Sequence, residues 1–179
     1  MKFDKSKKLL VIGRAGMDIY PEPPGTKISD VQEFSTHLGG SAANTCVALS
    51  KLGVSSDLIT CISDDAIGEY IFKKLEDFNV GSNLCRRVDK KFQTQVAVVE
   101  TILKNNQSIL YRNNSCDLQL DKEDIDKINF QDYSAVFISG TALSSSPSRE
   151  AVFYAAEKAS LLSIPLLMDM DYRPYNWES

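Results

Sequence analysis

Residues 38–53 read Leu-Gly-Gly-Ser-Ala-Ala-Asn-Thr-Cys-Val-Ala-Leu-Ser-Lys-Leu-Gly, and this stretch decides the fold. Its two glycines allow the backbone to approach another group closely. The small residues after them predict a helix, because Ala43, Cys46 and Val47 recur at helical spacing on one face. Gly53 is suited to end this helix, since glycine adopts the left-handed conformation at little cost.

Asn44 falls in the first turn of the predicted helix, near the positive end of the helix dipole. Its side chain offers a donor and an acceptor, which suits a polyhydroxylated ligand resting on Gly39 and Gly40. The alternative is structural: the glycines only permit close packing. A motif this short does not distinguish the two interpretations.

Composition narrows the classes of partner. The chain has 179 residues, 43% hydrophobic and 25% charged, which is typical of a globular domain with its own core. A net charge of −4 gives no case for nucleic acid or an anionic membrane, and no apolar run is long enough to span a bilayer. The four cysteines show no C-x-x-C pair, so we expect reduced thiols and a cytoplasmic location. With His37 as the single histidine, we expect no metal site and no Ser-His-Asp triad.

Alternating strands and helices predict an α/β fold with a doubly wound, mostly parallel sheet flanked by helices. Apolar runs predict core strands at 9–12, 57–62, 135–138 and 165–168. Helices are predicted at 66–79, at 121–128 with Asp121 as cap, and at 146–162 with Ser146 as cap and Pro147 in its first turn.

A small separate sheet is predicted from the segments near 26–38 and 92–113, which are β-rich and joined within the second segment by a polar turn at 104–107. Such a sheet would close over something; the alternative is an ordinary edge hairpin of the main sheet. Residues 20–25 contain three prolines, which remove backbone donors and fix φ, so no regular structure is expected there.

Polar side chains follow the ends of the predicted strands. Arg14 and Asp18 come after the first strand, Asn44 starts the helix after the glycines, and Asp171 and Arg173 come after the last strand. Because ligands bind at the carboxyl ends of strands in open α/β sheets, we expect one pocket there. Carboxylates and amides suit sugar hydroxyls, whereas the arginine fork suits a carboxylate, so Arg14 and Arg173 are the candidates for an acidic group.

Structural alternatives remain for these residues. Asp18 also suits a turn or cap, and 171–173 also suit a surface turn closed by Pro174. The G-x-x-G at 13–16 is not the dinucleotide fingerprint G-x-G-x-x-G, so a dinucleotide-binding domain is disfavoured.

Three segments in order carry a resemblance that runs over nearly the whole chain: 13–21, 39–44 and 169–174, with Trp177 after the last. Together they resemble the ribokinase-like (PfkB) carbohydrate kinases, and within them the 5-dehydro-2-deoxygluconokinases of inositol catabolism. The resemblance implies ATP-dependent phosphorylation of a sugar acid with Mg²⁺. The small sheet would then be a lid over the sugar. The implied substrate-binding residues are Arg14, Asp18, Gly39, Gly40, Asn44, Asp171 and Arg173.

The resemblance also shows what is missing. Such kinases carry an N-x-x-E motif and a later G-x-G-D segment that supplies the catalytic aspartate and an anion hole, and neither occurs in residues 1–179. We therefore expect an amino-terminal half with the substrate half-site and lid, no catalytic residue, most of the ATP site elsewhere, and no kinase activity alone. Phosphoryl transfer needs those parts to neutralise and position the phosphates.

Three alternatives stay open. Another kinase of the superfamily, acting on 2-keto-3-deoxygluconate, fructose or a nucleoside, would differ in substrate alone. A non-catalytic sugar-binding module is favoured by the missing base. A dinucleotide-binding domain is the third. We further expect a homodimer through the lid, and association at an uncovered parallel strand edge near 165–169.

Overall fold

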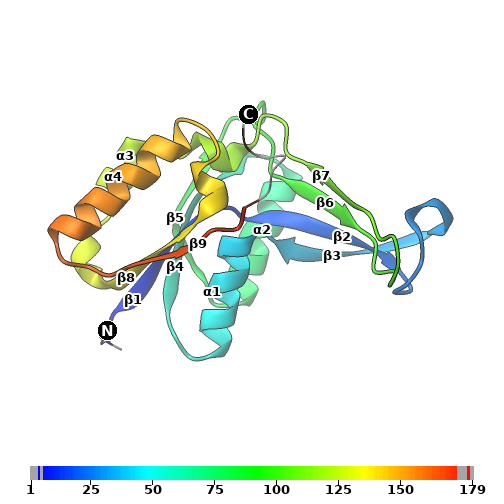
Figure 1. The fold of residues 1–179 in the computed structure, drawn as a ribbon, viewed down its shortest axis with the longest axis horizontal. Helices are drawn as coiled ribbons and strands as arrows, with labels where there is room; N and C mark the ends of the chain where they lie inside the picture. The colour runs from blue at the N-terminus through cyan, green and yellow to red at the C-terminus, as the bar shows by residue number, and fades with distance from the viewer. Residues whose placement is uncertain (1–3, 5, 173–176, 178–179) are drawn as a thin grey trace.

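The computed structural model describes residue 4, residues 6–172 and residue 177, and it contains two sheets (Figure 1). The larger sheet is parallel throughout, with β1 at its centre in the order β5-β4-β1-β8-β9. Its strands are β1 (Lys8–Ile12), β4 (Ser56–Ser63), β5 (Gly81–Val88), β8 (Tyr133–Ser139) and β9 (Leu166–Asp169).

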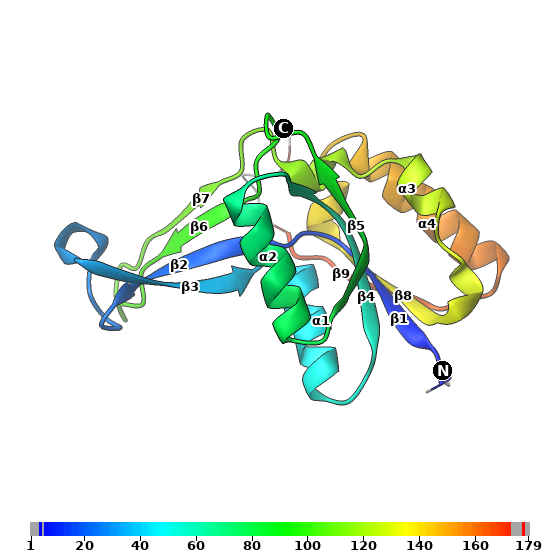
Figure 2. The same cartoon turned by 180° about the vertical axis from the view of Figure 1, so that it is seen from behind.

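Helices cover both faces of this sheet (Figures 1 and 2). They are α1 (Ser41–Lys51), α2 (Ala66–Asp77), α3 (Lys122–Asp126) and α4 (Ser148–Leu161). The alternation of side chains along β1 explains the arrangement, because Leu10 and Ile12 pack in the cluster with α3 and α4, whereas Val11 packs in the cluster with α1 and α2. The predicted doubly wound α/β fold is confirmed.

A second, four-stranded sheet projects from the side of the main sheet (Figure 1), in the order β3-β2-β6-β7. Its strands are β2 (Gly16–Glu22), β3 (Glu33–Gly39), β6 (Val96–Val99) and β7 (Ser108–Tyr111). The predicted hairpin is present but has a longer turn, since Val99 is opposite Ser108. Glu100 holds this turn: its carboxylate accepts the N–H of Gln107 at 2.9 Å and that of Ile28 at 3.0 Å.

Short 3-10 helices occupy four of the connections: η1 (Ile28–Asp30), η2 (Cys116–Gln119), η3 (Phe130–Asp132) and η4 (Gly140–Leu143). Two predicted helix boundaries are confirmed. Gly53 follows α1 with φ of 76°, and Asp121 caps α3 through its side chain as part of a capping box. Within residues 4, 6–172 and 177, no helix is long and apolar enough to cross a membrane.

Three features differ from the predictions. First, β2 continues through Pro21 to Glu22, so the expectation of irregular structure at 20–22 is wrong. Pro21 pairs with Phe34 of β3, whereas β6 pairs with β2 no further than Ile19. At Pro21 the strand is therefore paired on one side, where a missing N–H is tolerated.

Second, β5 was not predicted. Its sequence mixes polar and charged residues because it is an edge strand, paired with β4 alone among the strands of the described sheet. Third, Ser146 is not the cap of α4. Pro147 occupies the N-cap position, and the Ser146 hydroxyl donates to the Glu150 carboxylate at 2.6 Å instead.

Candidate functional site

Gly39 and Gly40 join the small sheet to α1 at the carboxyl edge of the main sheet. Gly39 ends β3, and Gly40 is the N-cap of α1 with φ of 93°, a conformation that glycine adopts readily. A β-carbon on Gly40 would collide with the carbonyl oxygen of Arg14, which accepts the N–H of Ala43 at 3.3 Å. The segment after β1 therefore lies directly on the start of α1.

Asp18 of β2 lies opposite His37 of β3, and its carboxylate occupies the space where Gly39 would carry a side chain. Burial raises the pKa of Asp18, although the charge of Arg14 and a hydrogen bond with Tyr20 oppose this effect. The Tyr20 and His37 rings meet edge to face at 5.4 Å. A carboxylate in this partly dehydrated place gains from a hydroxyl that donates to it, as a sugar hydroxyl does.

Hydroxyl groups connect the start of α1 to the end of β8. The Ser41 and Ser139 hydroxyls are hydrogen-bonded at 2.8 Å, and those of Ser139 and Thr141 at 3.0 Å. Ser139 and Thr141 are fully buried. Gly13 lies between these elements, since a β-carbon there would be 2.7 Å from Ala42 Cβ. The ends of β1 and β8 and the start of α1 thus meet in one place.

The end of β9 reaches the same edge. Asp169 pairs with Ser139, and a β-carbon on Gly140 would collide with the carbonyl oxygen of Met170. The Asp171 N–H donates to Asp169 Oδ1 at 3.0 Å, and Asp171 has φ of 34°. Asp171 is therefore positioned just beyond the end of β8.

Four of the seven predicted site residues are brought together by these contacts: Arg14, Asp18, Gly39 and Gly40. Arg14 is buried, with 8% of its surface exposed. Asn44 is exposed one helical turn along α1 and donates its N–H to the Gly40 carbonyl at 2.9 Å. Asp171 shares the sheet edge, and Arg173 lies outside the described residues.

A buried ion pair beside this edge was not predicted. Arg112, just after β7, donates to Asp117 at 2.6 Å, and their side chains are 7% and 3% exposed. Arg112 also donates to the Thr141 carbonyl at 3.3 Å and to Ser144 Oγ at 3.5 Å. Arg112 therefore connects the end of β7 in the small sheet to the segment that follows β8. The only local signal is an opposite-charge pair five residues apart after a predicted strand.

The described residues include no group of three or more histidine, cysteine, aspartate or glutamate side chains placed to hold a metal ion. All four cysteines are free thiols. The edge instead offers carboxylate, hydroxyl and backbone groups, with a buried guanidinium beside them. This chemistry fits a small hydroxylated ligand.

Comparison with known sequences agrees with this chemistry. The profile described as pfkB family carbohydrate kinase matches residues 6–179. Curated proteins named 5-dehydro-2-deoxygluconokinase are 34–36% identical to the chain. The one from Photobacterium profundum is 36% identical over 176 residues, which cover 98% of this chain and 53% of the relative. The chain spans about half the length of the curated relatives it matches.

Solved structures of sugar kinases share the fold. A sugar kinase from Pyrococcus horikoshii is 27% identical with a TM-score of 0.81, over 96% of this chain and 57% of that one. A fructokinase from Xylella fastidiosa with bound ATP has a TM-score of 0.85 at 21% identity, over 97% and 52% of the two chains. At that identity the second likeness concerns the fold alone.

Proposed function

The chain belongs to the pfkB family of carbohydrate kinases, and we propose that it forms the substrate-binding part of an ATP-dependent kinase for 5-dehydro-2-deoxygluconate in inositol catabolism. The observation that carries the proposal is the position of Asp18, whose carboxylate lies on Gly39 at the edge where the two sheets meet. A carboxylate there suits a sugar hydroxyl, and the buried Arg14 beside it suits the acid group of an aldonic acid.

Each proposed role follows from the chemistry of the group. Asp18 accepts hydrogen bonds from hydroxyls, while Asn44, in the first turn of α1, both donates and accepts. Gly39 and Gly40 leave room for the ligand to approach the backbone. Arg14 and Arg173 pair with the carboxylate, and Asp171 adds a second acceptor. The small sheet acts as a lid, because β2 and β3 carry Asp18 and Gly39 themselves.

Phosphoryl transfer is not assigned to this chain alone. Kinases of the family use ATP, and we propose that Mg²⁺ accompanies it. When bound, ATP supplies the phosphoryl group, whereas the residues described above bind and orient the sugar acid. The catalytic base belongs to a part of such a kinase that residues 1–179 do not contain, so we propose that the chain by itself is inactive.

Calorimetric titration with 5-dehydro-2-deoxygluconate tests this proposal. We expect saturable binding at one site and no phosphorylation in the presence of ATP and Mg²⁺. Asp18→Asn should weaken binding about tenfold, roughly 1.4 kcal/mol. Asp30→Asn, which removes an exposed carboxylate on η1, is the matched control and should bind as the unmodified chain does. Phosphorylation above background would contradict the inactivity, and no binding of any sugar acid would contradict the site.

Substrate identity is tested by competition. Fructose, 2-keto-3-deoxygluconate and a nucleoside are offered with 5-dehydro-2-deoxygluconate, and we expect the last to bind best. The two neutral compounds should bind weakest, because the guanidinium groups of Arg14 and Arg173 suit a carboxylate, which the two sugar acids carry. Better binding of a neutral sugar would assign the chain to another sugar kinase of the family. Binding that persists without turnover after the missing kinase residues are supplied would favour a sugar-binding module.

We also propose that two lids associate in a homodimer. Alternation along β3 and β7 places Phe34 and Tyr111 on the face opposite Asp18, and they are 47% and 60% exposed. Phe34→Lys should shift sedimentation toward a monomer, and an unchanged mass would contradict this arrangement. A cytoplasmic location completes the proposal, supported by the four free thiols.

A further inference from the structure

Two glycines face each other in the small sheet, beside the carboxylate of Asp18. Gly16 at the start of β2 is directly opposite Gly39 at the end of β3. Gly16 and Asp18 present their side-chain positions on the same face of β2, because side chains alternate along a strand. We call Gly16 and Gly39 the glycine pair. Since neither residue carries a side chain, other groups can lie directly on this area of backbone.

Gln95, the residue before β6, lies over one half of the glycine pair. Its carbonyl accepts the N–H of Met17 at 3.0 Å, which holds the backbone of Gln95 beside β2. A β-carbon on Gly16 would be 3.3 Å from Gln95 Cδ and 3.4 Å from Nε2. The Asp18 carboxylate lies over Gly39 in the same way. The amide and the carboxylate therefore lie over opposed residues, whose β-carbon positions in such a pair are about 5 Å apart.

The side chain of Gln95 is buried without the partners that a buried amide needs. The residue is 2% exposed, and among the described residues its Oε1 has no hydrogen-bond partner. Buried polar groups are normally hydrogen-bonded, and one that is not lowers the free energy of unfolding. An apolar side chain of the same length would avoid this cost. The contacts within the fold therefore give no reason for an amide at this position.

We propose that Gln95 determines ligand specificity by binding, together with Asp18, one hydroxyl group of the bound sugar acid over the glycine pair. The hydroxyl donates its proton to the Asp18 carboxylate and accepts an N–H of Gln95 Nε2. One oxygen can lie about 2.8 Å from both groups when they are this close together. The last side-chain torsion of glutamine is broad, so the amide can also turn its oxygen toward a donor of the ligand. The identity of the ligand rests on the proposed function, to which this contact adds a residue.

Gln95→Met tests the proposal, because methionine keeps the length of the side chain and removes the amide. We expect 5-dehydro-2-deoxygluconate to bind about tenfold more weakly in calorimetric titration. The free energy of unfolding in urea should stay the same or rise, since the variant buries no amide that lacks a partner. A glutamine with a purely structural role would give the reverse pattern. An unchanged affinity overturns the proposal, whatever the stability of the variant.

Thr94→Val is the matched control on the neighbouring residue. Thr94 is also buried, but its hydroxyl is hydrogen-bonded to the Ser63 hydroxyl at 2.6 Å and accepts the Ser63 N–H at 3.1 Å. Its substitution should therefore lower the free energy of unfolding and leave the affinity for the sugar acid unchanged. An equal loss of affinity with Thr94→Val and Gln95→Met would overturn the assignment to Gln95.

The side-chain amide signals of Gln95 in NMR spectra of the unmodified chain give a second measurement, which does not depend on how a variant folds. These signals should shift when 5-dehydro-2-deoxygluconate is added, because the ligand hydroxyl accepts from Nε2. Signals that stay in place at a saturating concentration of the sugar acid would overturn the contact.

Competition among the four compounds separates this proposal from the proposed function. If fructose or a nucleoside binds better than the sugar acids, the proposed substrate is wrong, and Gln95→Met should then weaken binding of that compound about tenfold instead. If 5-dehydro-2-deoxygluconate binds best and Gln95→Met leaves its affinity unchanged, the proposed substrate stands and the role of Gln95 is overturned. If none of the four compounds binds, both proposals are overturned.

Discussion

The carboxylate of Asp18 in β2 lies against Gly39 in β3. The two strands are neighbours in the small sheet, and their pairing brings β2 to the start of α1. The relationship between the two residues is steric: any side chain on Gly39 would displace the carboxylate. The glycine therefore defines where the acceptor lies as well as leaving room for a ligand. Two kinds of substitution separate these roles.

Gly39→Ala should weaken sugar-acid binding more than it weakens the fold. Its backbone is outside the left-handed region, so alanine adds no conformational strain there, but its β-carbon would push the Asp18 carboxylate away. We expect an affinity loss of about tenfold, near 1.4 kcal/mol. Calorimetry measures the affinity and urea unfolding the stability; an unchanged affinity would contradict the role of the carboxylate.

Gly40→Ala should destabilise the protein more than Gly25→Ala. The two glycines have φ of 93° and 91°, so alanine pays a similar conformational cost at both. At Gly25 nothing lies within 4 Å of the added carbon, whereas at Gly40 it meets the Arg14 carbonyl. We expect about 1 kcal/mol for Gly25→Ala and about 1–3 kcal/mol more for Gly40→Ala. Equal losses of unfolding free energy in urea would mean that the Arg14 contact is unimportant.

Asp18→Asn should stabilise the fold at neutral pH relative to the unmodified chain. Since the pKa of Asp18 is raised by burial, its contribution to stability is present below the ordinary value of 3.8 and is lost as the pH rises through the raised value. The stability difference between variant and unmodified chain should therefore grow in favour of the variant from about pH 4 to about pH 7. Urea unfolding at both pH values measures it, and a difference independent of pH would contradict the raised pKa.

Much of the main sheet was predictable because its central strands are buried on both faces and leave a mostly apolar run. β1, β4 and β8 are of this kind. β5 escaped prediction because its edge position admits Arg86 and Arg87, whose partners come from other elements. Pro21 was misjudged for a related reason: whether a proline is tolerated depends on how far the neighbouring strand extends, which local sequence does not specify.

The candidate site was predictable to the extent that strand ends share an edge. This rule placed Arg14, Asp18 and Asn44 at one edge. The structure brings Arg14 and Asp18 close together, while Asn44 is exposed in the first turn of α1. It did not indicate that Asp18 lies on Gly39, because that contact depends on the register of β2 and β3. Nor did it indicate Arg112, whose acceptor at Thr141 is far along the chain.

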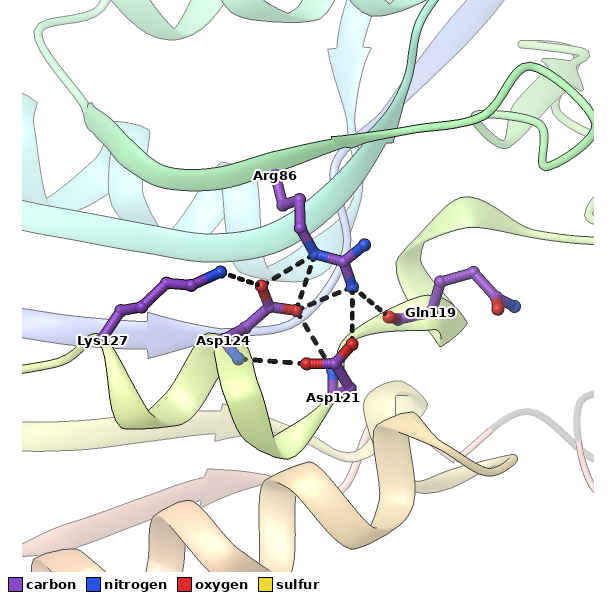
Figure 3. A network of polar contacts seen from close by, with 5 residues as sticks. All are labelled: Arg86, Gln119, Asp121, Asp124 and Lys127. Carbon is purple, nitrogen blue, oxygen red and sulfur yellow. Dashed lines mark hydrogen bonds and ion pairs between the residues drawn. The ribbon is translucent and has the colours of Figure 1, made fainter.

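Arg86→Met should destabilise the protein strongly, unlike Arg87→Met. Arg86 donates to both oxygens of Asp124, to the Gln119 carbonyl and to Asp121, and Asp124 also accepts from Lys127 (Figure 3). Asp124 is 4% exposed and would be left without its main partner, at a cost of about 2–3 kcal/mol. Arg87 makes exposed ion pairs worth about 0–1 kcal/mol.

The same network predicts a pH dependence. Burial alone would raise the pKa of Asp124, but the hydrogen bonds from Arg86 and its neighbours outweigh burial and lower it. The pair therefore stabilises the fold above the ordinary pKa of 3.8, and this contribution is lost as the pH falls through the lowered value. In urea unfolding, the difference in unfolding free energy between Arg86→Met and the unmodified chain should become smaller as the pH is lowered. A difference that became larger instead would contradict the lowered pKa of Asp124.

Arg112→Met should loosen the small sheet from the main sheet. Among the described residues, the substitution leaves the buried Asp117 carboxylate with the hydrogen bond from the Ser115 hydroxyl, at a cost of about 3 kcal/mol. It also removes the bonds to Thr141 and Ser144, so amide exchange in β6 and β7 should accelerate. Arg112→Lys keeps the charge but cannot reach all three acceptors. Its stability and its amide exchange should therefore lie between those of Arg112→Met and the unmodified chain.

A double-mutant cycle with Asp117→Asn separates the pair from its surroundings. If the charges matter mainly to each other, the double variant should cost less than the sum of the single variants, because no uncompensated charge stays buried. Strict additivity in urea unfolding would mean that Arg112 acts through Thr141 and Ser144 alone. In that case the hydrogen bonds from Arg112 to Thr141 and Ser144 would connect the small sheet to η4. Amide exchange in the small sheet should then depend on Arg112 but not on Asp117.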